Sequence, residues 1–380
     1  MYNAHMIDRL VAPRIARSRK SVLLLGPRQT GKSTLCRALK PDLILDLAGE
    51  PEYLRHAKDP HAFRRLLEGA SRTRLVFVDE IQRVPSILNV IQTIIDRPGG
   101  PRFLLTGSSA RKLRRGRANL LPGRIILETL DPLSILELGH RFSLERALQV
   151  GTLPGVYLDE QEGAEVLSTY AEVYLREEIR AEALTRDLGG FARFLDTAAL
   201  TSGQWINYSK LSSDAEISRE TIRRFYSILE DTLLVFRLPP FAPRHKTSRR
   251  LSQRDRFIFV DIGIRNALLG LHRRAPGPEQ MGPAFEQWFI AQVAILNRAL
   301  RKGWALSSYR TEGGAEVDLV VESDRAVMGI EIKSSPRVRP PDFRGLHSLG
   351  EMVGKYKPFT RYVAYRGKDR LGFGPRSAAI

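Results

Sequence analysis

The residues from Gly26 to Thr34 have the types and spacing needed to bind phosphate groups. An apolar run, Ser21 to Leu25, leads into two glycines separated by four residues, followed by a lysine and a serine. Glycines let backbone N–H groups approach phosphate oxygens, the lysine reaches the β- and γ-phosphates, and the serine hydroxyl binds Mg²⁺. The pattern predicts a P-loop whose nucleotide-binding residues are Gly26, Pro27, Arg28, Gln29, Thr30, Gly31, Lys32, Ser33 and Thr34. An ordinary glycine turn is the alternative interpretation.

A second stretch, Leu75 to Gln82, supplies carboxylates to the same site. It is a β-branched and aromatic run that ends in Asp79 and Glu80, as expected of a buried parallel strand whose carboxyl end faces a nucleotide. We expect Asp79 to hold Mg²⁺ with Ser33, and Glu80 to orient or deprotonate the attacking water. A strand that ends in solvated acids is the alternative. Together the two stretches predict ATP hydrolysis with Mg²⁺ rather than nucleotide binding alone.

Length and charge describe the wider chain. Its 380 residues are enough for roughly two or three domains. The formal net charge of +18 makes nucleic acid the first partner to consider, with a solvated basic surface or an arginine-rich codon usage as the alternative. The single cysteine, Cys36, excludes a disulfide framework and suits a reducing cytoplasm.

The sequence predicts no membrane segment, because no run approaches the ~18 apolar residues needed to span a bilayer. The N-terminus carries Arg9, Arg14, Arg17 and Arg19 but lacks the apolar centre of a signal peptide. We therefore expect a cytoplasmic protein whose N-terminal helix packs on the core.

The first ~150 residues alternate between strand and helix patterns, which is typical of an α/β domain with a parallel sheet. Thr106 and Ser108 follow a further strand, Arg102 to Thr106, and are candidates to sense the γ-phosphate or position water; a simple turn is the alternative. The remaining strands are expected at Asp42 to Leu47 and Ile125 to Leu130, and the helices at Thr34 to Leu39, Glu50 to Glu68, Ser86 to Ile95 and Arg111 to Arg117.

The order of these motifs resembles a known family. Gly26–Thr34, Leu75–Gln82, Leu104–Ser109, Gly123-Arg124 and Asp131–Glu137 look like the AAA-type ATPases of bacteria and archaea that carry a C-terminal domain of restriction-endonuclease-like fold. The resemblance implies a P-loop, AAA-type ATPase core with a parallel sheet (1–150), a helical lid (151–188), a winged-helix DNA-binding module (189–250) and a C-terminal α/β PD-(D/E)XK nuclease-like domain (251–380). It implies no settled biological role.

Arg124 lies just before the last core strand, where ring-forming ATPases present an arginine to the neighbouring subunit. Such an arginine neutralises transition-state charge. We therefore expect a homo-oligomer, with a hexameric ring as one option. The lid would begin at the glycine-proline turn Gly151 to Gly155 and continue as a long charged helix, Glu165 to Leu184.

Residues 191–241 have the pattern of a small DNA-binding module. A short helix begins at Tyr208, Glu216 to Ser218 form a turn, and a capping box starting at Ser218 opens a second helix that runs to Glu230. Leu233 to Leu238 is the expected arm of a wing. A winged helix would place its second helix in the major groove, but such modules also bind proteins. The candidate DNA contacts are Arg219, Arg223 and Arg224 on the second helix, and Arg244, Lys246, Arg249 and Arg250 in a basic loop.

The C-terminal third carries an acid, a spacer and then Glu-x-Lys, which is the arrangement of PD-(D/E)XK nucleases. In such a site Asp318 and Glu331 would bind Mg²⁺ with help from Glu286, and Lys333 would orient or deprotonate the nucleophilic water. The alternative is a buried Lys333–Glu331 ion pair in a scaffold used for DNA binding or assembly. The tail from Lys368 to Ile380 is expected to be poorly ordered.

The leading hypothesis is an oligomeric, ATP-hydrolysing motor or remodeller of duplex or branched DNA, for example at recombination or repair junctions. One alternative is an ATP-gated, Mg²⁺-dependent DNA nuclease in defence or repair. The other is a signalling ATPase whose winged helix binds protein.

Overall fold

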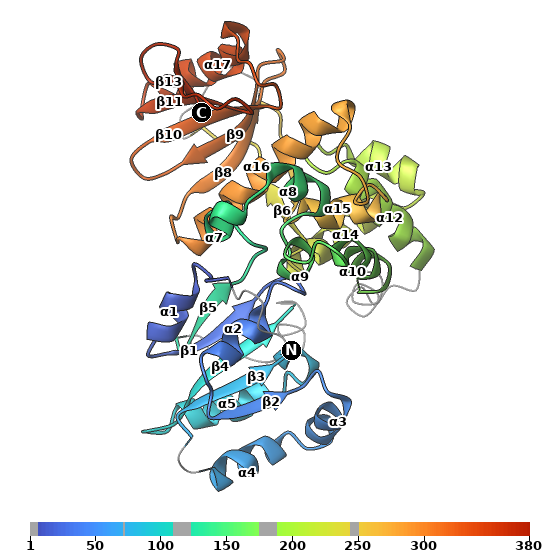
Figure 1. Cartoon of the computed structure of the whole chain (residues 1–380), viewed down its shortest axis with the longest axis vertical. Coiled ribbons are helices and arrows are strands. Elements are labelled where there is room, and N and C mark those ends of the chain that lie inside the picture. The colour runs from blue at the N-terminus through green and yellow to red at the C-terminus, as the bar shows by residue number, and fades with distance from the viewer. Residues whose placement is uncertain (1–6, 71–72, 109–122, 175–187, 244–250) are drawn as a thin grey trace.

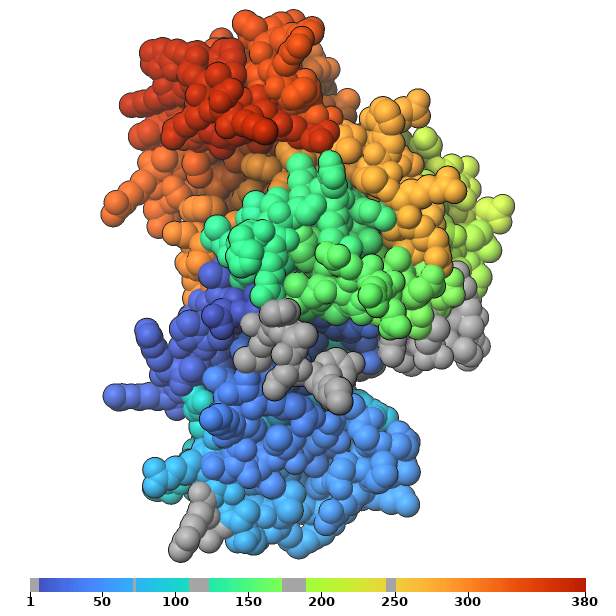
Figure 2. Space-filling model, viewed as in Figure 1, coloured from blue at the N-terminus to red at the C-terminus, as the bar shows by residue number. Residues whose placement is uncertain are grey.

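A computed structural model describes residues 7–70, 73–108, 123–174, 188–243 and 251–380. The N-terminal sheet lies at one end of the molecule, a second sheet lies at the other, and helices fill the space between them (Figure 1). The space-filling view shows the same succession from the N-terminal third to the C-terminal residues (Figure 2). Within the described ranges, no helix combines the length and apolar character needed to cross a membrane.

The N-terminal sheet is parallel and has the strand order β2-β3-β4-β1-β5. The inner strands β1, β3 and β4 read as apolar runs because both of their faces are covered. In β1, Leu23 and Leu25 pack in the cluster that includes α5, and Val22 and Leu24 pack in the cluster of α1 and α2. The predicted α/β fold with a parallel sheet is therefore confirmed. The elements are α1 Ala12–Arg17, β1 Ser21–Leu25, α2 Lys32–Ala38, β2 Leu43–Asp46, α3 Glu50–Lys58, α4 His61–Gly69, β3 Leu75–Asp79, η1 Ile81–Arg83, α5 Ile87–Ile95, β4 Arg102–Gly107 and β5 Ile125–Thr129.

One predicted helix of this domain is wrong in its extent. The stretch from Glu50 to Glu68 forms two helices, because Pro60 lacks a backbone N–H and its preceding residue Asp59 leaves the helical conformation. The predicted helix Arg111 to Arg117 lies outside the described residues.

Short helices follow the core: α7 Ile135–Leu138, η2 Gly139–Arg141, α8 Leu144–Val150, α9 Pro154–Tyr157 and α10 Gly163–Thr169. The predicted long helix from Glu165 is not regular, since α10 passes into a π-helical turn, η3 Tyr170–Tyr174, before the described range ends. The glycine-proline turn is tied to a later element: the buried Asp261 carboxylate accepts hydrogen bonds from the Thr152 N–H at 2.6 Å and the Ile264 N–H at 3.1 Å. Burial raises the pKa of Asp261 to about 6.

The next segment contains α12 Leu188–Leu200, α13 Tyr208–Ala215, α14 Arg219–Asp231, β6 Val235–Leu238, β7 Arg256–Phe259 and α15 Ile262–Leu268. The buried face of α14 contains Ile222, Phe225, Ile228 and Leu229, as predicted. The Ser218 hydroxyl accepts the Thr221 N–H, so it caps α14. The predicted capping box is wrong, because its third helical residue is Thr221 rather than Glu or Gln.

Strands β6 and β7 pair as an antiparallel hairpin. The predicted domain boundary at residue 250 therefore falls between two strands that pair with each other. A single hydrophobic cluster also joins Leu153, Leu167 and Tyr170 to Phe194 and Phe225. The segments predicted as lid and winged helix thus share one core.

The C-terminal region forms a mixed sheet in the order β12-β13-β11-β10-β9-β8, with β8, β9 and β10 antiparallel and β10 and β11 parallel. The expectation of a poorly ordered tail is wrong, because Ser377–Ala379 pair with β11. The elements are α16 Pro278–Ala299, β8 Ala305–Arg310, β9 Glu316–Glu322, β10 Val327–Lys333, η4 Pro340–Phe343, α17 Arg344–Val353, β11 Phe359–Tyr365, β12 Leu371–Gly372 and β13 Ser377–Ala379.

Candidate functional site

The predicted P-loop connects the carboxyl end of β1 to α2. Gly26 must be a glycine here, because a Cβ atom would lie 2.2 Å from the Leu130 carbonyl oxygen. Gly31 has a φ of 88°, a left-handed conformation that glycine adopts without strain. The Gly26 N–H donates to the Gly107 carbonyl at 3.3 Å, so the loop starts directly beside the end of β4. The sheet therefore brings the P-loop and the sensor candidates of β4 to one edge.

The Lys32 side chain is buried against the backbone of the P-loop. Its side chain is only 5% exposed, and its ammonium donates to the carbonyl oxygens of Gly26 at 2.9 Å and Pro27 at 2.8 Å. Thr30 is fully buried and donates to the Pro27 carbonyl at 3.0 Å, whereas Thr34 is exposed. An ammonium held over the loop is placed to bind a phosphate once it leaves these carbonyls.

Arg9 supports the P-loop from behind, a role that the sequence did not reveal. Its guanidinium donates to the Thr30 carbonyl at 2.6 Å, to the Asp131 carbonyl at 2.5 Å and to the Glu137 carboxylate at 3.0 Å. The Asp131 carboxylate in turn accepts two hydrogen bonds from Arg298 of α16, at 2.8 and 2.9 Å. Asp131 therefore links Arg9, which contacts the P-loop, to Arg298 near the end of α16.

Ser33 and Asp79 meet as predicted for a magnesium pair. The Ser33 hydroxyl donates to Asp79 Oδ1 at 3.0 Å, and the Thr106 hydroxyl donates to the same oxygen. Burial raises the pKa of Asp79, while the hydrogen bonds from Thr106 and Ser33 oppose this rise. A buried carboxylate beside a serine hydroxyl matches the oxygen ligands that Mg²⁺ prefers, and a cation would offset the burial of the negative charge. These residues fit the ion that the sequence predicts.

Glu80 follows in a left-handed conformation, with a φ of 54°. Its N–H donates to the Thr106 hydroxyl at 3.1 Å, so Thr106 contacts both acids. Its carboxylate accepts a hydrogen bond from the Gln82 amide, which also donates to the Ser108 hydroxyl at 3.1 Å. The structure thus brings Glu80, Thr106 and Ser108 together, and it adds Gln82, whose role the sequence analysis missed.

Arg124 lies at the other end of the strands, away from the P-loop. Strand β5 starts beside Ser21, the first residue of β1, so Arg124 stands at the end away from Gly26. Its guanidinium makes two hydrogen bonds to the Asp96 carboxylate, at 2.6 and 3.0 Å. Arg124 therefore does not reach the P-loop of its own chain, and its role toward a neighbouring subunit stays a prediction.

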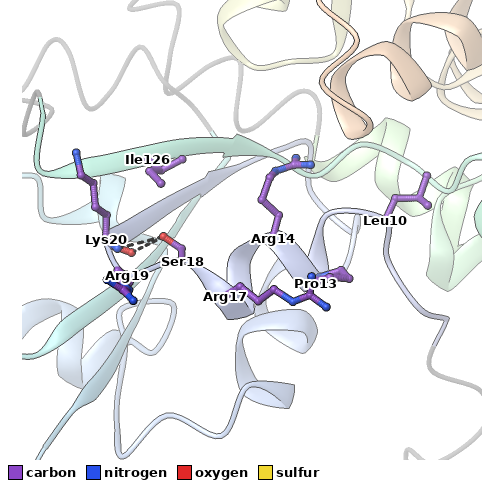
Figure 3. A pocket seen from close by; sticks show the side chains of 8 residues that line it. All are labelled: Leu10, Pro13, Arg14, Arg17, Ser18, Arg19, Lys20 and Ile126. Atoms are coloured by element: carbon purple, nitrogen blue, oxygen red, sulfur yellow. Dashed lines mark hydrogen bonds between the residues drawn. The ribbon is translucent and has the colours of Figure 1, made fainter.

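A hollow of about 590 Å³ lies at this same end of the strands, between α1 and β5. Figure 3 shows basic side chains around it, and Leu10, Pro13 and Ile126 form its apolar lining. It is separate from the nucleotide site, because Lys20 and Ile126 lie beside the first residues of β1 and β5 rather than at their carboxyl ends.

The predicted DNA contacts fall into two groups. Arg219, Arg223 and Arg224 are exposed on α14, opposite its buried face, and the Arg223 guanidinium lies 4.7 Å from the centre of the Tyr208 ring. Arg244, Lys246, Arg249 and Arg250 lie outside the described residues. The helix thus offers the predicted basic face.

The predicted nuclease residues lie close to one another, but two of their carboxylates form ion pairs with basic side chains of the protein. Glu286 pairs with the buried Arg256, whose guanidinium also donates to the Asp318 carbonyl at 3.0 Å. Lys333 Nζ donates to Glu331 Oε1 at 2.6 Å, as in the ion-pair alternative. Burial and the neighbouring Glu286 and Glu331 raise the pKa of Asp318 well above its ordinary value. Within the described ranges, no group of His, Cys, Asp and Glu is arranged to hold a metal, so a magnesium site at Glu286, Asp318 and Glu331 is not preformed.

Comparison with protein families divides the chain in the same order. Residues 18–139 match a family model described as an AAA domain. Residues 141–275 and 281–380 match two further models, each described as a domain of unknown function (DUF8612 and DUF4143).

Relatives extend over most of the chain. An uncharacterized protein of Mycobacterium tuberculosis is 30% identical over 329 residues, which cover 83% of this chain and 71% of the relative. An uncharacterized protein of Haemophilus influenzae is 25% identical over 280 residues, 67% of this chain and 68% of the relative.

A solved structure of the replication initiator DnaA, bound to AMPPCP and single-stranded DNA, is 12% identical and covers 60% of this chain and 90% of its own. Its TM-score is 0.31, and a likeness this weak supports no conclusion about function. The AAA domain match and the mycobacterial relative are decisive: the chain belongs to the family of that relative and is an AAA-type ATPase.

Proposed function

We propose that the protein hydrolyses ATP and uses this turnover, as an oligomer, to move or remodel duplex or branched DNA. The observation that carries the ATPase part is the convergence of Lys32, Ser33, Asp79, Thr106 and Glu80 at the carboxyl edge of the sheet. The exposed arginines of α14 carry the DNA part.

In the proposed reaction, Lys32 exchanges its carbonyl contacts for the β- and γ-phosphates of ATP. Ser33 and Asp79 would hold Mg²⁺, which would supply Lewis-acid stabilisation of the negative phosphate oxygens. Glu80 accepts a proton from water as the water oxygen attacks the γ-phosphorus, and the bond between this phosphorus and the bridging oxygen of ADP breaks. Thr106 fixes the position of the Asp79 side chain relative to the Glu80 backbone through its two hydrogen bonds.

DNA binding is proposed for the face of α14 that carries Arg219, Arg223 and Arg224. These side chains are exposed while the opposite face of the helix is packed in the core, and α13 precedes α14 across a tight turn at Glu216. The hairpin of β6 and β7 follows directly, which supports a winged-helix arrangement. Arginine side chains on such a helix can contact phosphates and bases in the major groove.

The double variant Arg219→Ala/Arg223→Ala tests this surface. We expect it to weaken binding of a duplex at least about tenfold and to flatten the dependence of log affinity on log salt by about 2, one for each lost phosphate contact. Fluorescence anisotropy over a series of salt concentrations measures both quantities.

The matched control is Arg55→Ala/Lys58→Ala, which removes the same charge from the exposed surface of α3. Equal losses in both variants would mean that net charge alone attracts DNA. Weak binding that salt does not change in the unmodified protein would favour the signalling alternative, in which this module binds protein.

The ATP-gated nuclease is a second candidate function. It is favoured by the placement of Asp318, Glu331 and Lys333 on the adjacent strands β9 and β10. In this alternative, Mg²⁺ would have to separate Glu331 from Lys333 and Glu286 from Arg256 before cleavage.

A further inference from the structure

Gln82 is a buried side chain beside the proposed catalytic acid. It lies in the short helix η1, directly after Glu80, and is 5% exposed. The left-handed conformation of Glu80 turns the chain so that Gln82 points back to the end of β4. Its amide nitrogen donates one hydrogen bond to Glu80 Oε2 and another to Ser108 Oγ, at 3.1 Å for the latter. One amide thus links the acid to a sensor candidate.

The contact between Glu80 and Gln82 determines which way the Gln82 amide faces. An ionised carboxylate only accepts hydrogen bonds, so the NH₂ group of Gln82 must face Glu80. The amide oxygen then points toward Gly107, where a Cβ atom would lie 2.8 Å away from it. Among the described residues, this buried oxygen has no hydrogen-bond partner. A buried carbonyl without a partner destabilises a fold, so the amide is not explained by fold stability.

We infer that Gln82 is a positioning residue for ATP hydrolysis: it holds the Glu80 carboxylate in the direction of the attacking water and ties that direction to Ser108. The inference rests on the proposed ATPase function. A glutamate without this contact can rotate about its side-chain bonds, and even a misplacement of about 1 Å of a reacting group can slow a reaction about a hundredfold. Binding of ATP itself depends on Lys32 and the P-loop, which Gln82 does not contact in the described hydrogen bonds.

The variant Gln82→Met separates positioning from packing. Methionine has nearly the same length and volume but no donor, and it removes the unpartnered oxygen. We expect kcat to fall about 10- to 100-fold, while KM for ATP changes less than about threefold. The melting temperature should change little, because the loss of two hydrogen bonds and the removal of the unpartnered oxygen act in opposite directions. Steady-state phosphate release, ATP titration and thermal unfolding measure these three quantities.

Gln287→Met is the matched control. Gln287 is also a buried glutamine, 2% exposed, and within the described part of the chain neither its amide nitrogen nor its amide oxygen has a hydrogen-bond partner. It lies in α16, far along the chain from the P-loop. We expect this variant to keep the kcat of the unmodified protein, which would show that the exchange of glutamine for methionine is not harmful by itself.

A second variant, Gln82→Glu, keeps the shape of the side chain but places an acceptor against Glu80. It should also lose kcat, whereas a residue that only fills space would tolerate this change better than a shortened side chain such as Gln82→Ala. Unchanged kcat in Gln82→Met would overturn the inference, and so would a clear fall in its melting temperature, because Gln82 would then serve the fold. Glu80→Gln separates a failure of the Gln82 inference from a failure of the proposed function. If Glu80→Gln hydrolyses ATP as fast as the unmodified protein, the proposed function fails and not only the role of Gln82.

Discussion

Replacing Lys32 by alanine is expected to reduce ATP turnover at least about a hundredfold. Lys32 is buried in the P-loop, where its ammonium already lies within hydrogen-bond distance of the Gly26 and Pro27 carbonyls. Removing it leaves the β- and γ-phosphates without the charge that neutralises them in the transition state. Phosphate release at saturating ATP and Mg²⁺ measures the loss.

Lys58→Ala provides the comparison, because Lys58 is an exposed lysine at the end of α3 and makes no contact with the P-loop in the described residues. Its turnover should match that of the unmodified protein. Unaltered hydrolysis in Lys32→Ala would exclude the P-loop as the site of the reaction.

Replacing Arg124 by alanine is expected to lower turnover by about a thousandfold if Arg124 completes the site of a neighbouring subunit. Strand β5 separates Arg124 from the catalytic edge of its own chain by about 16 Å, at ~3.3 Å per residue. An effect of this size must therefore act between subunits. In mixed assemblies, Arg124→Ala subunits should inhibit unmodified subunits by more than their share.

Asp96→Ala distinguishes this role from a local ion pair. It removes the partner that now holds Arg124 but keeps the guanidinium, so an arginine acting on a neighbour should remain active. Exposed ion pairs contribute little to stability, so neither variant should unfold the domain. Similar, proportional losses in both variants would contradict the intersubunit role.

Motif spacing brought the residues of the proposed nucleotide site to one edge of the sheet, because these residues lie close together in the sequence. The P-loop spans Gly26 to Thr34, and Asp79 and Glu80 are adjacent, so a strand pattern before each group was enough to place them at one edge of a sheet. The same reasoning identified Thr106 and Ser108, because parallel strands end at the same edge.

Arg9 and Gln82 were missed for the opposite reason. Arg9 contacts Thr30, Asp131 and Glu137, which lie 21, 122 and 128 residues further along the chain. No local pattern encodes such contacts. Gln82 was visible beside Glu80, but its proposed role depends on the left-handed turn at Glu80 and on Ser108, which follows β4.

The C-terminal constellation shows where residue spacing is insufficient. Asp318, Glu331 and Lys333 were found from their spacing, but the spacing did not show which charged side chains of other elements lie beside Asp318. Arg256, from the hairpin strand β7, forms an ion pair with Glu286. Burial is the largest reason that the pKa of Asp318 is raised, and the neighbouring carboxylates of Glu286 and Glu331 add to it.

The most direct measurement is the rate of ATP hydrolysis by the unmodified protein with Mg²⁺, in the absence and presence of single-stranded DNA, duplex DNA and a four-way junction. The labelled DNA is scored for cleavage in the same reactions. We expect one DNA structure to stimulate hydrolysis strongly while the DNA stays intact. Cleavage that disappears in Asp318→Ala would instead establish the nuclease alternative. ATP turnover that no DNA changes would contradict a DNA motor or remodeller.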